Sequence, residues 1–172
     1  EAPINYTDTA NGTSSAAPQV SGAAALLLEA NPKLGYRDVK EILMRTAIQD
    51  GLQGNDGFSK NAGGFSFSHA FGAGLLNVSG ALALAKDWKN LDILRVTEYG
   101  FTGPNAIPDD GTALSMDLNF NAAADKLRVE HVELTVNVKH KNRGDLQFVI
   151  QSPSGFVAAA LPRKPDDNAD FT

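Results

Sequence analysis

The sequence GTSSAAPQVSGAAALLLEANP at residues 12–32 is the strongest structural signal in this chain of 172 residues. Its alanines and leucines recur at helical spacing, Pro18 lies near the start, and Asn31-Pro32 is typical of a helix end. The pattern predicts a helix over 14–30, with the proline in its opening turn. Because Glu29 is the first charged residue of the run, we expect this helix to be buried on all sides.

The composition excludes several classes of protein. A net charge of −5 argues against binding the phosphate backbone of nucleic acids. The absence of cysteine excludes disulfides, thiolate nucleophiles and cysteine-ligated zinc. The longest purely apolar run, 23–28, is far too short to span a membrane. A hydrophobic share of 42% is sufficient for a globular core.

Two more helices are expected in the front half of the chain. Val39, Ile42 and Leu43 recur at helical spacing in 36–47, which predicts an amphipathic surface helix. Its outward face would carry four charged residues: Arg37, Lys40, Glu41 and Arg45. The segment 51–64 is rich in glycine, asparagine and aspartate, which indicates a loop. A third helix is predicted at 78–86 with Asn77 as its N-cap.

The back half changes to the pattern of β-strands. Apolar residues alternate over 132–138 and again over 146–150, and turn residues stand at 142–145 and 152–155. Leu127 and Val129 lie on the opposite parity, which a bulge near Glu130-His131 would reconcile. We therefore divide the chain into a mainly helical domain at 1–89 and an antiparallel β domain at 90–172.

Ser14 is the candidate nucleophile. A hydroxyl at a helix N-terminus lies among unpaired backbone N–H groups and at the positive end of the helix dipole, where an oxyanion is stabilised. Gly12 allows the backbone to turn tightly beside a substrate, and Thr13 completes the Gly-Thr-Ser motif. The alternative is that Ser14 only caps a core helix, as many such serines do.

The motif Gly-Thr-Ser-x-Ala-Ala-Pro at 12–18 resembles the nucleophile motif of the subtilisin-like serine proteases. Further segments resemble the kexin/furin branch of that family, whose catalytic domain is followed by a β-rich P domain (Homo B). They are GAAALLLEANP at 22–32, YRDV at 36–39, SHAFGAGLLN at 68–77, ALALAKDW at 81–88, NRGDL at 142–146 and SPSG at 152–155.

The resemblance implies an α/β fold: the C-terminal part of a subtilisin-like catalytic domain, followed by part of a jelly-roll-like antiparallel β-sandwich. It implies a secreted, calcium-dependent serine endopeptidase acting on polypeptides, with Ser14 as nucleophile. The family's Asp, His and oxyanion Asn precede the serine, and Asn5, Asp8 and Asn11 are too close to take those roles. We expect these partners upstream of Glu1, so the chain alone should be inactive and should hold no metal itself.

Other interpretations of the chain remain open. The chain could be a non-catalytic, P-domain-bearing interaction or stabilising module. Arg143-Gly144-Asp145 matches an adhesion tripeptide, although a turn between strands is the simpler interpretation. The resemblance gives His69, His131 and His140 no catalytic role, and a packing role is favoured for His69. Calcium ligands would lie upstream of Glu1, and the cysteine-free composition suggests a bacterial source.

Overall fold

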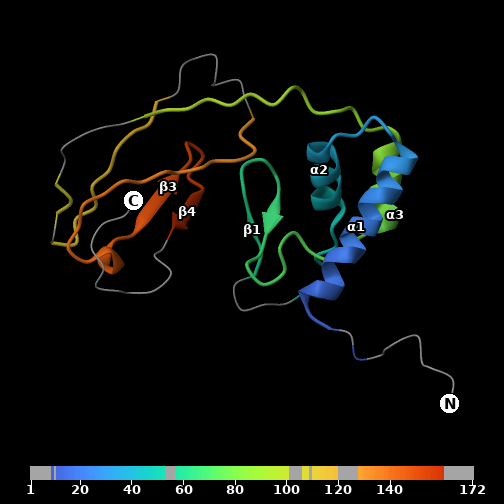
Figure 1. The fold of residues 1–172 in the computed structure, drawn as a ribbon, viewed down its shortest axis with the longest axis horizontal. Helices are drawn as coiled ribbons and strands as arrows, with labels where there is room; N and C mark the ends of the chain where they lie inside the picture. The colour runs from blue at the N-terminus through green and yellow to red at the C-terminus, as the bar shows by residue number, and fades with distance from the viewer. Residues whose placement is uncertain are drawn as a thin grey trace. The chain divides into compact units, whose positions relative to one another are not determined.

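The structure, a computed structural model, describes residue 9 and residues 11–52, 57–100, 106–108, 110–119 and 128–160. The chain separates into two units, a first unit at Glu1–Asp92 and a second unit at Ile93–Thr172. Figure 1 shows the three helices in the first unit and the β3–β4 hairpin in the second.

Three helices build the core of the first unit. They are α1 at Thr13–Ala30, α2 at Tyr36–Thr46 and α3 at Val78–Lys86, and α3 contacts both of the others. Helix α3 packs against its neighbours through Ala81 and Ala85, which are fully buried. Their small side chains allow the helices to approach closely. The core cluster consists of Leu27, Leu34, Ile42, Ala81 and Ala85.

Helix α1 differs from the expectation in two respects. Pro18 is its sixth residue rather than part of its opening turn. Only Ala23 and Leu27 are buried, whereas Val20, Leu26 and Leu28 remain 43–45% exposed. The expectation of burial on all sides is therefore wrong for this chain, because the described residues cover only one side of an apolar helix.

Helix α2 confirms the predicted position and apolar face, with one correction. Val39 and Leu43 pack against the core around Ile42. Glu41, which was expected on the outward face, is only 7% exposed. Its carboxylate binds Arg45 one turn later, with Oε1 at 2.7 Å from Nη2. The positive charge of Arg45 offsets the cost of burying this carboxylate. The helical spacing of the apolar residues does not by itself indicate that burial.

Helix α3 confirms both its predicted bounds and its predicted cap. The side chain of Asn77 accepts a hydrogen bond from the Gly80 N–H at 2.9 Å. The residues that lead to this helix form short ladders. Strands β1 (Ser59–Lys60) and β2 (Ser66–Phe67) pair antiparallel, so the predicted loop at 51–64 contains one short strand. Residues 53–56 of that loop lie outside the described residues.

A second ladder anchors the segment before α3 to the end of α2. The N–H of Ile48 donates to the Leu75 carbonyl at 2.9 Å, and the N–H of Leu75 donates back at 2.8 Å. Gly74 stands beside this ladder with φ at +129°, and a Cβ there would lie 2.5 Å from the carbonyl oxygen of Ile48. Only glycine fits such an approach.

The second unit contains one clear hairpin. Strand β3 (Phe148–Gln151) pairs antiparallel with β4 (Val157–Ala160), in the register Gln151 opposite Val157. The predicted turn at 152–155 joins them, and the Ser152 N–H donates to the Phe156 carbonyl at 2.8 Å. The predicted turn at 142–145 is a single 3₁₀ turn, Arg143–Asp145. The sequence pattern is therefore confirmed for this part of the unit.

Of the strand predicted from the alternation at 132–138, the described residues form only an isolated bridge at Val138. Leu127 lies outside the described residues, and 128–137 contain neither helix nor strand, so the expected bulge at Glu130-His131 has no ladder to interrupt. Alternation shows which face of a strand would be buried, but a strand also needs a neighbour for its backbone hydrogen bonds. The described residues show small antiparallel sheets and no sandwich. None of the described helices is both long and apolar enough to cross a membrane.

Candidate active site

Ser14 occupies the second position of α1 and is exposed. The helix begins at Thr13, and Gly12 precedes it with φ at +82°, a left-handed conformation that favours glycine. The cap position therefore belongs to Gly12, and no side chain caps the helix. This placement contradicts the alternative in which Ser14 merely caps a core helix.

The backbone around Ser14 suits a developing negative charge. The N–H groups of Thr13 and Ser14 lie in the first turn, where no preceding helical carbonyl is available to accept from them. The first turn contains no acidic residue that would compete for these donors. An oxyanion at this position would meet both the N–H groups and the positive end of the helix dipole.

The other serines of α1 use their hydroxyls within the helix, and Ser14 does not. Ser15 donates from Oγ to the carbonyl of Asn11 at 3.3 Å, and Ser21 donates to the carbonyl of Ala17 at 3.2 Å. Pro18, four residues after Ser14, has no N–H to donate to the Ser14 carbonyl. Of the three serines of this helix, Ser14 is therefore the one whose hydroxyl makes no hydrogen bond to another described residue.

The structure pairs each histidine of the chain with a group other than Ser14. The ring of His69 packs edge-on against Phe67 with the centroids 5.3 Å apart, as expected for a packing role. His131 faces Glu133 at 3.3 Å, and His140 Nδ1 lies 2.6 Å from the carbonyl oxygen of Asn142. Asn5 and Asp8 lie outside the described residues. No general base is thus placed beside Ser14 by the part of the chain described.

The helix that carries Ser14 is held by its other end. Ala23 and Leu27 are buried, and the Asn31 side chain, at the C-cap, donates from Nδ2 to the Ala85 carbonyl of α3 at 2.9 Å. The packed half of α1 thus fixes the helix axis while the half that carries Ser14 is accessible. This is the arrangement that a positioned nucleophile needs.

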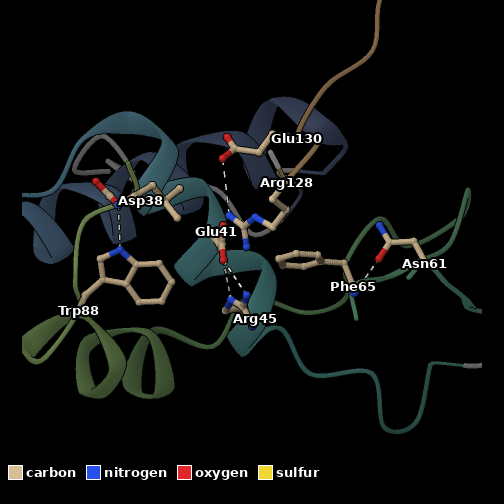
Figure 2. A network of polar contacts seen from close by, with 9 residues as sticks. Asp38, Glu41, Arg45, Asn61, Phe65, Trp88, Arg128 and Glu130 are labelled. Atoms are coloured by element: carbon tan, nitrogen blue, oxygen red, sulfur yellow. Dashed lines mark hydrogen bonds and ion pairs between the residues drawn. The ribbon is translucent and has the colours of Figure 1, made fainter. Parts of the chain in front are cut away.

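Asp38, a residue that the sequence analysis did not single out, is the centre of a polar network in the same unit. Figure 2 shows its carboxylate facing the indole of Trp88. Oδ1 accepts hydrogen bonds from Trp88 Nε1 at 2.8 Å and from the Leu91 N–H at 2.7 Å, while Oδ2 accepts from the Gly35 N–H at 2.8 Å. The side chain is only 4% exposed. The available signal was its position as the third residue of a helix after glycine, where a carboxylate can cap the backbone.

The environment of Asp38 favours its charged form. Burial by itself would raise the pKa of this carboxyl group. The hydrogen bonds from Leu91, Trp88 and Gly35, together with the positive charge of Arg37, outweigh burial and hold the pKa below its ordinary value of 3.8. Asp38 is therefore a buried anion whose two oxygens accept hydrogen bonds from three protein donors.

A second buried carboxylate on α2 has a different set of partners. Glu41 binds Arg45, whose guanidinium lies 4.9 Å above the ring centroid of Phe65. Phe65 in turn closes a small turn, since its N–H donates to the Asn61 side chain at 3.0 Å. Figure 2 shows Phe65 beside Arg45 of α2 and Asn61 further from the helix. Asp38 thus binds a segment outside α2, whereas Glu41 binds Arg45 of the same helix, and Arg45 makes the contact to Phe65.

Comparison with known proteins identifies two family segments in the chain. Residues 1–74 match the subtilase family, and residues 129–172 match the proprotein convertase P-domain. The matched subtilase segment contains Ser14 and the whole of α1 and α2. The matched P-domain segment contains the β3–β4 hairpin.

Curated relatives align with nearly the whole chain. Endoprotease bli-4 of Caenorhabditis elegans is 36% identical over 97% of the chain, and neuroendocrine convertase 2 of Rattus norvegicus is 34% identical over 95%. Furin-like protease 1, isoform 1-CRR, of Drosophila melanogaster is 30% identical over 92%. The chain spans only 18%, 26% and 14% of the lengths of these three relatives.

These relatives correct one expectation and settle the family. All three come from animals, so the bacterial source suggested by the cysteine-free composition is wrong. Both matches occur in the order expected from the motifs at 12–18 and 142–146. The chain belongs to the kexin/furin-like branch of the subtilisin-like proteases, and it joins a segment of the subtilase domain to a segment of the P-domain.

Proposed function

We propose that the protein containing this chain is a serine endopeptidase that cleaves polypeptides and uses Ser14 as its nucleophile. The observation that carries this proposal is the exposed Ser14 at the second position of α1, beside first-turn N–H groups that no helical carbonyl occupies. Family membership supports it, since the relatives carry the names of endoproteases and convertases.

The proposed mechanism begins with attack by Ser14 Oγ on the scissile carbonyl. The hydroxyl proton passes to a histidine, which an aspartate orients, and both residues belong to parts of the catalytic domain outside this chain. The Ser14 N–H and an asparagine side chain, also from outside the chain, donate to the oxyanion. The amine leaves with the proton from the histidine, and water then hydrolyses the acyl-enzyme.

Gly12 and Thr13 support this chemistry through the backbone. The left-handed Gly12 redirects the chain immediately before the helix, and open space surrounds its Cα where a Cβ would stand. A substrate backbone can therefore approach Ser14 closely from this side. Thr13 supplies the first N–H of the helix next to that of Ser14.

The second unit has a supporting role in this proposal. We infer that residues 90–172 contribute to an antiparallel β-sandwich, the P domain, which packs against the catalytic domain and stabilises it. The β3–β4 hairpin supports this inference, because it supplies one antiparallel pair of such a sheet. Calcium would act elsewhere in the parent protein. No step above requires the ion.

Covalent labelling tests the role of Ser14. A fluorophosphonate probe should label the complete protein at Ser14, as located by peptide mass spectrometry, and Ser14→Ala should abolish both labelling and peptide hydrolysis. The expected loss in kcat is about 10⁶-fold, the magnitude known for subtilisin. Ser21→Ala is the matched control, because Ser21 lies on the same helix but bonds its hydroxyl to Ala17. Full labelling should persist in that control.

Two results would contradict the proposal. One is hydrolysis that survives Ser14→Ala, which would mean that another residue is the nucleophile. The other is labelling of Ser14 in the 172-residue chain alone at the rate of the complete protein. That result would show that activation of the hydroxyl needs no histidine from outside the chain.

A further inference from the structure

The segment that follows α3 remains attached to the first unit by a set of hydrogen bonds. We call residues 88–92 the junction, because the first unit ends at Asp92 and the second begins at Ile93. The junction contains neither helix nor strand. Its attachment must therefore come from side chains and from packing rather than from a backbone ladder.

Asp38 supplies the central part of this attachment. Its Oδ1 binds the junction at two points three residues apart, the Trp88 indole and the Leu91 N–H. Its Oδ2 binds the Gly35 N–H at the start of α2. One buried carboxylate thus connects the helix start to both ends of a four-residue stretch. Trp88 also packs against the buried core, which adds apolar contact to the hydrogen bonds.

Two further contacts fasten the junction from the loop before α2 and from its first turn. Asn90 donates from Nδ2 to the carbonyl of Lys33, and Arg37 donates from Nη1 to the carbonyl of Asp92 at 2.6 Å. Arg37, beside Asp38 on α2, is the charged group that acts on its carboxylate, whereas Lys89 in the junction is exposed. These contacts reach the last residue of the first unit. Ile93, the next residue, is 89% exposed.

We propose that Asp38 is a positioning residue that clamps the junction to α2, so that the chain is able to change direction between the two units only from Ile93 onward. The role of Asp38 is then to fix the point and the direction from which the P-domain segment leaves the catalytic segment. Without the clamp, the point of articulation would move back to the end of α3 at Lys86. The proposal does not depend on the identity of the nucleophile.

Limited proteolysis of the complete protein measures the clamp directly. Trypsin cuts after lysine, but it needs several residues around the bond to leave the folded surface. Lys89 lies inside the junction and is exposed, so the bond between Lys89 and Asn90 is protected by the contacts that hold the junction to the first unit, with Asp38 at their centre. The experiment uses a Ser14→Ala background to prevent self-digestion, and cleavage is followed by peptide mass spectrometry.

The Asp38→Asn variant should increase the rate of cleavage after Lys89 by about tenfold or more, because an amide cannot accept at the position facing the Gly35 N–H and lacks the charge that strengthens the other bonds. Trp88→Phe should give a smaller increase, since it removes one donor and keeps an aromatic ring in the core. Glu41→Gln is the matched control. It neutralises the other buried carboxylate of α2, which binds Arg45 and not the junction, and it should leave the Lys89 rate unchanged.

Cleavage after Lys60, an exposed lysine in strand β1 of the same unit, reports on opening of a segment that Asp38 does not contact. The proposal is supported if Asp38→Asn accelerates cleavage after Lys89 while the Lys60 rate stays constant. It is overturned if the Lys89 rate does not change. It is also overturned if both rates rise by the same factor or if Glu41→Gln matches Asp38→Asn, because Asp38 would then act only through general stability.

Discussion

The first unit and the second unit form their backbone hydrogen bonds in different ways. Helices α1, α2 and α3 close their hydrogen bonds within each segment and bury a shared core around Leu27 and Ile42. In the second unit the described ladder is β3 with β4, and residues 93–100 and 128–137 form neither helix nor strand. Apolar residues such as Ile93 and Val96 are 89% and 77% exposed there.

This difference reflects how the two kinds of element depend on the rest of a protein. A helix needs only its own residues for hydrogen bonds, so it forms in a chain that spans a small part of its relatives. A strand needs neighbours that lie far away in the sequence. The hairpin β3–β4 forms because its partner strand is only a short turn away. Three pairs of substitutions, each at the same type of residue in the two units, test this difference.

The largest effect is expected from a pair of isoleucines. Ile42 is fully buried in the core of the first unit, so Ile42→Ala should lower the free energy of unfolding by about 2–5 kcal/mol. Ile93→Ala should change it by about 0.5 kcal/mol or less, because that side chain is exposed. Urea unfolding followed by the helical circular dichroism signal measures both. Equal losses for the two variants would show that Ile93 is covered in the complete protein. That result would contradict the difference in burial between the two units.

A pair of left-handed glycines should give the next largest effect. Gly74→Ala places a Cβ against the Ile48 carbonyl in a conformation that alanine avoids, and should cost about 3 kcal/mol. Gly111 in the second unit also has a positive φ, +82°, but has open space around it, so Gly111→Ala should cost about 1 kcal/mol from strain alone. Thermal unfolding gives the two costs. Hydrogen exchange at the Ile48 and Leu75 amides should accelerate only in the Gly74 variant, and unchanged exchange there would argue against the close approach.

The sequence predicts the helices well because each helix has a local signal. The period of apolar residues in 36–47 and the cap at Asn77 are sufficient for α2 and α3. The alternating pattern at 132–138 looks equally clear, yet only Val138 forms a bridge and 132–137 form neither helix nor strand, because the pattern does not specify a partner. The exposed sides of α1 have a similar origin. Its composition predicts burial, but burial depends on what packs around the helix.

The candidate site was predictable to the extent that it is a local motif. Gly12 and Ser14 are placed as the motif requires, on a left-handed turn and at a helix start. Asp38 could not be recognised in this way, because two of its three donors, Trp88 and Leu91, lie 50 and 53 residues further along the chain. The burial of Glu41 was missed because the pairing with Arg45 is consistent with an exposed helix face as well.

The smallest effect is expected from acid, and it compares Asp38 with Asp110. Both carboxyl groups have a pKa below 3.8. For Asp38, the hydrogen bonds from Leu91, Trp88 and Gly35 outweigh a burial that would raise the pKa. For Asp110, hydrogen bonds from Thr112 lower the pKa of an exposed group. Since each pKa is depressed on folding, the stabilisation is present above about pH 4 and is lost as the pH falls through the lowered value.

Hydrogen exchange between pH 5 and pH 3, corrected for the intrinsic effect of pH on exchange, separates the two carboxylates. On acidification, peptides covering α2 and residues 88–92 should lose protection in the wild-type protein, because protonation removes an acceptor from buried donors. In Asp38→Asn the same peptides should already be less protected at pH 5 and should change little at pH 3. Asp110→Asn should follow the wild type in α2, since an exposed Asx turn is solvated by water in either state. An Asp38→Asn protein that still loses protection in α2 on acidification would assign that pH dependence to another group.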